Sequence, residues 1–145
     1  MRAQISLDLL FAFVLVTLTM LNLIYLSNSE IAHAESFDVM AKVRVFSTEI
    51  VDHTAKVYAV GEGYSLKEEP PQIEGAEFNI TFNGAENKII VNVTVNGKSY
   101  WVVKNSTVPI ANASIVVESG GEFWIKTVKI GDMLYANITK GTNGN

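Results

Sequence analysis

The first 60 residues of the chain show two successive hydrophobic patterns. The first covers residues 4–26, which read QISLDLLFAFVLVTLTMLNLIYL, and residues 9–26 are apolar on every side except at Thr17, Thr19 and Asn22. As a helix, residues 9–26 would extend about 27 Å, which is close to the thickness of the hydrocarbon core of a membrane. This pattern predicts a membrane-spanning helix at residues 4–26.

The second pattern is amphipathic and covers residues 27–60, which contain neither Pro nor Gly. Apolar residues recur there in steps of mostly three and four, and charged residues lie on the opposite side. We therefore expect one helix over residues 4–60, on the order of 85 Å long, with Ser27-Asn28-Ser29-Glu30 as its weakest point. The apolar positions of the amphipathic part are Ile31, Ala34, Met40, Val43, Phe46, Ile50, Val57 and Tyr58.

The remaining chain changes to a period of two. Gly61 and Gly63 end the helix and Pro70-Pro71 prevents its resumption, so residues 61–75 are predicted to form a connecting loop. Asn96-Gly97 predicts a type I′ hairpin turn, while Gly120-Gly121 and Gly131-Asp132 are predicted to join later strands as hairpins. Alternating apolar and polar residues predict six short strands, at residues 77–82, 88–95, 98–103, 114–119, 122–129 and 133–139.

Together these patterns predict an α+β fold. A long N-terminal hydrophobic and amphipathic helix, residues 4–60, precedes a small antiparallel β domain, residues 76–145, which forms a sandwich or partial barrel. The inner face of this sheet is expected to cover the apolar stripe of the helix at residues 31–58. Residues 141–145 are predicted to be a frayed tail.

One carboxylate, Asp8, lies near the start of the apolar stretch. Moving an ionised Asp into hydrocarbon costs at least a few kcal/mol, so Asp8 requires a partner charge or a position at the headgroups. Arg2 is the only Lys or Arg before Lys42. This charge bias places the N-terminus in the cytoplasm and the chain after the span outside the cell.

Gln4, Ser6 and Asp8, followed by the apolar run, resemble the class III signal peptide of archaeal type IV pilin-like proteins. In that family a short polar leader precedes Gln-x-Ser-x-Glu, and Asp8 stands where the family usually has Glu. The resemblance is confined to the N-terminal segment. It implies that residues 1–3 are a leader peptide, that a prepilin peptidase cuts between Ala3 and Gln4, and that the apolar helix stays with the mature chain.

The resemblance also implies a function and a location. The precursor would be anchored in the membrane with its C-terminal domain outside, and the pilus assembly machinery would then build it into an extracellular homo-polymer through the N-terminal helix. The Asp8 carboxylate would pair with the free amine of Gln4 in a neighbouring subunit. If Gln4 cyclised to pyroglutamate, this amine would be lost and Asp8 would need another partner such as Ser6.

Two alternative interpretations of the N-terminal segment stay open. Ala32-His33-Ala34 fits the small-x-small pattern of signal peptidase, and cleavage after Ala34 would release a secreted β domain. An uncleaved helix would instead give a single-span surface glycoprotein or adhesin that does not polymerise. For an adhesin, five aromatic residues are candidates for a sugar-binding surface, namely Tyr100, Trp101, Phe123, Trp124 and Tyr135.

Five Asn-x-Ser/Thr sequons occur in the second half of the chain, at Asn79, Asn92, Asn105, Asn112 and Asn137. Asn79 and Asn92 alternate with the apolar rows of their predicted strands, so they are expected on the solvent side, where a glycan can project without disturbing the core. We therefore predict N-glycosylation of at least two sites. This prediction agrees with an extracellular β domain.

Composition argues against other classes of function. The net charge is −4 and no basic cluster occurs, so no nucleic-acid partner is expected. The chain has no Cys, which excludes a disulfide framework and thiolate chemistry. We interpret His33 and His53 as helix-surface residues and Glu68-Glu69 as solvated charge, because the Asp-rich spacing of a calcium loop is missing. No catalytic residue, metal site or cofactor is predicted, and the chain is not expected to be an enzyme.

Overall fold

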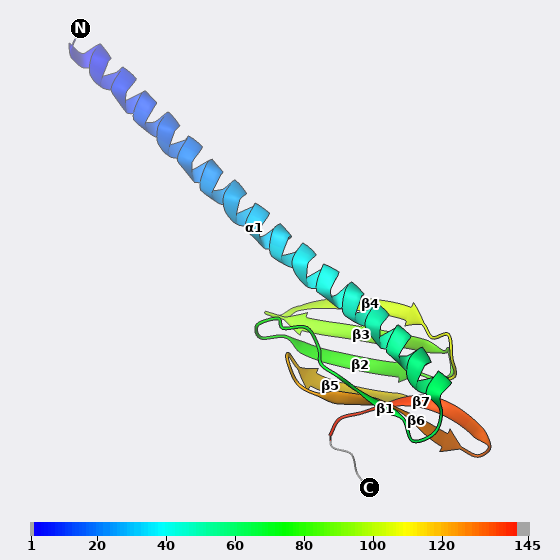
Figure 1. Ribbon diagram of the computed structural model, residues 1–145. Coiled ribbons are helices and arrows are strands. Elements are labelled where there is room, and N and C mark those ends of the chain that lie inside the picture. Colours follow the sequence, from blue (N-terminus) through cyan, green and yellow to red (C-terminus); the bar gives the residue numbers. More distant parts are fainter. Residues whose placement is uncertain (1, 142–145) are drawn as a thin grey trace. The chain divides into compact units, whose positions relative to one another are not determined.

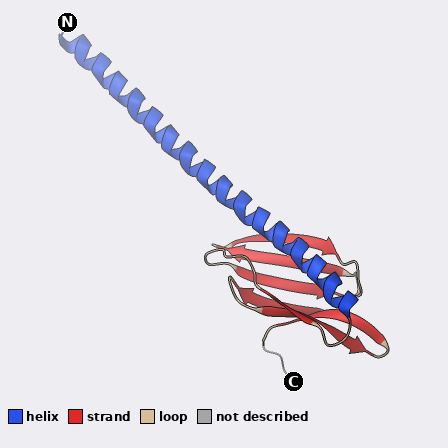
Figure 2. Cartoon of the chain, in the orientation of Figure 1, coloured by secondary structure: helices blue, strands red, loops and turns tan. Residues whose placement is uncertain are grey.

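The computed structural model describes the backbone of residues 2–141 and the side chains of these residues other than 2–6 and 32. Within this part, the helix α1 (Arg2–Val60) precedes seven strands in two antiparallel sheets (Figures 1 and 2). The predicted α+β fold is therefore confirmed. The chain divides into a first unit, Met1–Asp38, and a second unit, Val39–Asn145, and each is described by itself.

The first unit consists of the N-terminal part of α1. Helical backbone continues through Ser27-Asn28-Ser29-Glu30, so the predicted weak point does not interrupt α1. The hydroxyl of Thr17 donates to the Phe13 carbonyl at 2.8 Å, and the hydroxyl of Thr19 donates to the Leu15 carbonyl at 2.8 Å. These two polar groups are thus satisfied inside the helix, which is the condition for placing them in lipid.

The second unit contains both sheets and the C-terminal part of α1. The three-stranded sheet has the order β1-β6-β7, and the four-stranded sheet has the order β4-β3-β2-β5. All strand pairs in both sheets are antiparallel. The strands are β1 (Ser65–Glu68), β2 (Glu77–Asn83), β3 (Lys88–Val95), β4 (Lys98–Asn105), β5 (Ala113–Glu118), β6 (Phe123–Ile130) and β7 (Met133–Thr139).

Two of the predicted hairpin turns are confirmed. Asn96 and Gly97 join β3 to β4 with φ angles of 49° and 76°, the two positive values that a type I′ turn requires. Gly131, with φ of 64°, begins the turn between β6 and β7.

Two other details of the predicted β domain are wrong. The predicted loop at residues 61–75 contains β1, which pairs with β6; its four residues include Lys67 and Glu68 and offer no apolar row that would have marked it as a strand. Gly120-Gly121 joins β5 to β6 without forming a hairpin, because β5 pairs with β2 while β6 pairs with β1 and β7. The link therefore passes from one sheet to the other.

The hydrophobic core of the second unit lies between α1 and both sheets. Phe46 of α1 packs edge to face on Phe78 of β2 and on Phe123 of β6, with ring centroids 5.6 and 6.2 Å apart. The helix side of the core is buried and consists of Val43, Phe46, Ile50 and Val57. The predicted cover of the amphipathic stripe is thus confirmed from residue 43 to residue 57, whereas Ile31, at its predicted start, is exposed.

The end of α1 is fixed to the three-stranded sheet. Gly61 has φ of 101°, and its N–H donates to the Val57 carbonyl at 3.2 Å, which closes the last helical turn. The Gly61 carbonyl then accepts a hydrogen bond of 2.7 Å from the hydroxyl of Thr127 in β6. The helix therefore stops where Gly61 provides a conformation that other residues rarely adopt.

Candidate functional site

The first candidate site is the apolar surface of α1. All side chains from residue 7 to residue 26 are exposed, and Leu9, Phe13 and Leu15 are each about 70% exposed. The helix is long and apolar enough to cross a membrane, a property that signal sequences share. Because water solvates such a surface poorly, an exposed apolar surface of this size is typical of helices that contact lipid or other apolar helices.

Asp8 lies exposed at the N-terminal end of this apolar surface, between Leu7 and Leu9. The other residues of the predicted assembly site cannot be compared with it. The side chains of Ala3, Gln4 and Ser6 lie outside the described residues, as does Met1 of the predicted leader, and so do residues 142–145 of the predicted tail. Processing before Gln4 and pairing of Asp8 stay predictions.

The second candidate site is the outer face of the four-stranded sheet, where four of the five sequons gather. We call it the sequon face. Asn79 in β2 is the direct cross-strand partner of Asn92 in β3. Asn105 ends β4 and pairs with Lys88 of β3. Lys88 and Asn92 are an even number of residues apart on β3, so Asn105 lies on the same face as Asn92. Asn112 directly precedes β5. Asn79, Asn105 and Asn112 are exposed, and Asn92 is half-buried.

The hydrogen bonds of the sequon asparagines use the amide oxygen. Asn79 Oδ1 accepts from Ser114 Oγ at 3.1 Å, and Asn112 Oδ1 accepts from the Gly84 N–H at 2.7 Å. Asn137, which lies half-buried in β7, accepts from the Ile138 N–H at 2.8 Å. Since an N-glycan is attached to Nδ2, these three contacts are compatible with modification.

The five aromatic candidates for sugar contact do not form one exposed surface. Phe123 is fully buried in the core, and Tyr100, Trp124 and Tyr135 are half-buried. Trp101 differs from these residues because it projects from β4 on the sequon face and is 67% exposed. Of the five candidates for sugar contact, Trp101 is therefore the one that the fold presents to solvent.

The structure brings together a histidine and a carboxyl group whose contact the sequence did not reveal. Nδ1 of His53 in α1 lies 2.5 Å from Oε1 of Glu68 at the end of β1, and Glu68 is only 7% exposed. Burial raises the pKa of Glu68, the nearby Glu49 carboxylate raises it further, and His53 opposes both effects. The prediction of Glu68 as solvated charge is wrong, because it took no account of β1, whereas the His53 side chain is 36% exposed and lies at the helix surface as predicted.

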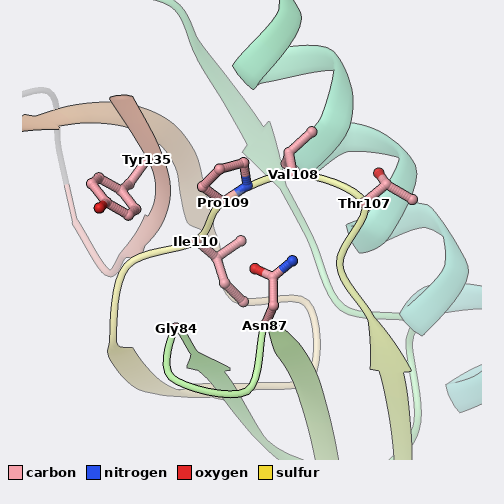
Figure 3. A pocket seen from close by; sticks show the side chains of 7 residues that line it. All are labelled: Gly84, Asn87, Thr107, Val108, Pro109, Ile110 and Tyr135. Carbon is pink, nitrogen blue, oxygen red and sulfur yellow. The ribbon is translucent and has the colours of Figure 1, made fainter. Parts of the chain in front are cut away.

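A small hollow lies beside the turn between β2 and β3 (Figure 3). Its volume is about 200 Å³, which is below the range of about 300–1,000 Å³ typical of small-molecule sites. A Cβ atom on Gly84 would lie 2.5 Å from the Ile110 carbonyl oxygen, so glycine allows the two segments to approach closely. We interpret the hollow as a packing gap; its lining residues are Gly84, Asn87, Thr107, Val108, Pro109, Ile110 and Tyr135.

Two features therefore remain as candidates for function, the apolar surface with Asp8 and the sequon face. Among the described residues, no three His, Cys, Asp or Glu side chains lie close enough together to hold a metal ion. Comparisons with models of protein families, with curated proteins and with solved structures found no match to this chain.

Proposed function

We propose that this chain is a structural subunit of an extracellular filament of the type IV pilus kind, assembled through the N-terminal part of α1. The observation that carries the proposal is the exposed apolar surface at residues 7–26, which is combined in one chain with a β unit that has its own core. Such a helix has two environments open to it, the lipid bilayer and a bundle of identical helices.

Transfer of the helix from lipid to a helix bundle replaces one apolar environment by another. The hydrophobic effect therefore favours neither state strongly, and side-chain packing and polar contacts decide the balance. The internal hydrogen bonds of Thr17 and Thr19 keep both hydroxyls satisfied in either environment. The span thus carries no polar group at these positions that would tie it to lipid headgroups.

Asp8 supplies the polar contact that distinguishes the two states. In the membrane its carboxylate stays at the headgroups, whereas in a bundle it would be surrounded by apolar helices and need a counter-charge. Cleavage between Ala3 and Gln4 would create an amine that a neighbouring subunit offers to Asp8. If Gln4 has cyclised, Asp8 would need another partner, such as the hydroxyl of Ser6.

The second unit would form the outer surface of the filament. Its five sequons and the position of Arg2 before the span both support an extracellular location. N-glycans at these sites would project from the sheets, since the acceptor asparagines lie at exposed or half-buried positions in the strands or, for Asn112, directly before one.

The proposal is tested by substituting Asp8 in the cells that make this chain. We expect Asp8→Ala to be processed and inserted into the membrane normally but to be absent from sheared surface filaments viewed by electron microscopy. Asp8→Glu should restore filaments, because it keeps the carboxylate. Glu30→Ala, which removes an exposed carboxylate of α1 beyond the span, is the matched control. Normal filament yield from Asp8→Ala would remove Asp8 from the proposed mechanism.

Intact-mass analysis of the mature chain separates the proposal from its alternatives. A chain that begins at Gln4, cyclised or not, supports a pilin-like subunit. A chain that begins at Met1 would indicate a single-span surface glycoprotein. A chain that begins at Glu35 would indicate a secreted protein, which would still contain all of the second unit.

A further inference from the structure

The sequon face carries a row of four residues in register, one from each strand. The row runs from Trp101 in β4 through Asn92 in β3 and Asn79 in β2 to Val116 in β5. The two central residues are sequon asparagines, and the two outer residues are exposed and apolar. Val103, two residues along β4 from Trp101, is exposed on the same face and extends the apolar patch.

We propose that an N-glycan on Asn92 packs its first sugar against the indole ring of Trp101 and so covers this apolar patch. The inference rests on the proposed extracellular location of the second unit, because a chain that stays inside the cell would not be glycosylated there. It adds to that proposal a specific contact and a role for Trp101.

The register places the two groups within reach. Cβ atoms of directly opposed residues on antiparallel strands lie about 4.5–5.5 Å apart, so a sugar attached to Asn92 begins next to the Trp101 side chain. Asn92 Oδ1 is buried without a hydrogen-bond partner among the described residues, whereas the glycan is attached to Nδ2. Burial of the oxygen therefore does not block the attachment atom.

The other side of Asn92 is already occupied. Asn79 is its partner on β2, and the Asn79 amide is held by Ser114 Oγ at 3.1 Å and by Thr81 Oγ1 at 3.4 Å. These two hydroxyls also contact each other at 2.9 Å, which makes a connected polar group between β2 and β5. We therefore expect a glycan on Asn92 to extend toward its other cross-strand neighbour, Trp101 of β4.

The chemistry of the two surfaces is complementary. One face of a pyranose ring consists largely of C–H groups, which carry partial positive charge, and the face of an indole ring is negative. Stacking would remove apolar area of Trp101 from water while the sugar hydroxyls remain solvated. The sequon face would then present sugar to solvent in place of an exposed tryptophan.

The first measurement is glycan occupancy on the chain isolated from the cells that make it. Mass spectrometry of glycopeptides should find Asn92 modified. An unmodified Asn92 beside glycans at Asn105 or Asn137 would overturn this inference alone and leave the extracellular location intact. A chain without any glycan would overturn the inference and also remove one support of the proposed function, which the filament assay tests separately.

The second measurement is the accessibility of Trp101. The chain has two tryptophans, so Trp124→Phe leaves Trp101 as the only indole fluorophore. In detergent solution, acrylamide should quench the glycosylated Trp124→Phe protein about twofold less efficiently than the same protein carrying Asn92→Gln. Asn105→Gln, which removes a sequon four residues along β4, is the control and should leave quenching unchanged. Equal quenching with and without the Asn92 glycan would overturn the proposal.

A double-mutant cycle that keeps Trp124 tests the same contact through stability. Trp101→Ala should lower the Tm of the glycosylated full-length protein by about 3–6 °C and should have no such effect in the Asn92→Gln background. An equal shift in both backgrounds would show that Trp101 contributes only to packing within the protein, and would overturn the role assigned to the glycan.

Discussion

The two ends of α1 have the same helical backbone and opposite surroundings. Between residues 7 and 26 all side chains are exposed, whereas between residues 43 and 57 the apolar side chains at steps of three, four and seven are buried against both sheets. The difference follows from the distribution of apolar residues around the helix axis. A stripe finds its partner within the chain, and a fully apolar surface needs a partner outside it.

This comparison also separates two sources of helix stability. The C-terminal part of α1 is stabilised by tertiary packing, as most helices of globular proteins are. The N-terminal part shows no such packing among the described residues, and under the proposed function lipid or other helices would stabilise it. The predictions below test this division, beginning with the largest expected effect.

Matched phenylalanine substitutions at the two ends of α1 should differ most. Phe46→Ala leaves a cavity between β2 and β6 and should reduce the free energy of unfolding by about 3–5 kcal/mol. Phe13→Ala removes a ring that is 71% exposed and should leave the unfolding of the second unit unchanged. Urea unfolding of the full chain in detergent, followed by tryptophan fluorescence, measures both. Equal destabilisation would mean that the two ends are not independent.

A charge placed at each end of α1 should affect membrane insertion, and here the larger effect is expected at the N-terminal part. Leu18→Lys puts an ammonium near the centre of the span and should disfavour membrane insertion by about 2.5–3.5 kcal/mol. Val45→Lys changes an exposed residue of the C-terminal part and should leave insertion unchanged.

The measurement for this pair is the fraction of chain that remains in membranes after alkaline extraction. Loss of membrane association with Val45→Lys would show that the C-terminal part also contributes to the anchor.

The smallest effect is expected from the buried carboxyl group of Glu68 in β1, which contacts His53 of α1. Because burial raises the pKa of Glu68 above its ordinary value of 4.5, the folded state holds this proton more tightly than the unfolded state. The contribution of Glu68 to stability is therefore present below pH 4.5 and is lost as the pH rises through the raised pKa. Relative to wild type, Glu68→Gln should gain stability over that interval, which urea unfolding at a series of pH values measures.

Glu86→Gln is the control for the pH series. The hydrogen bond that Lys88 donates to Glu86 lowers the pKa of Glu86, so the contribution of Glu86 to stability is lost as the pH falls and not as it rises. Because this pair is exposed, the effect of Glu86→Gln on stability should be small. If the free energies of unfolding of wild type and Glu68→Gln differed by the same amount at every pH, the assigned role of burial at Glu68 would be contradicted.

Local sequence signals were sufficient for the helix and for most strands. The period of three to four residues identified the buried stripe at Val43, Phe46, Ile50 and Val57, and Asn96-Gly97 identified its hairpin because both residues tolerate positive φ. These features depend on neighbours in the sequence. The assignment of Asp8, the cleavage before Gln4 and the glycans stay predictions that depend on partners outside the chain.

Features that depend on pairing between distant strands could not be predicted in the same way. β1 has no apolar alternation of its own and is a strand because it forms an antiparallel pair with β6. This pairing also buries Glu68 beside His53. The row from Trp101 to Val116 likewise exists only through the register of four strands. The sequence showed the sequons but not which aromatic residue they would adjoin.

The position of Phe46 has a mechanical consequence. Its ring contacts one strand of each sheet, and the carbonyl that follows the helix is tied to Thr127 in β6. A pulling force on α1 would therefore reach both sheets, through the ring contacts of Phe46 and through the hydrogen bond between Thr127 and Gly61. A filament built from such subunits would transmit tension through the core of each second unit.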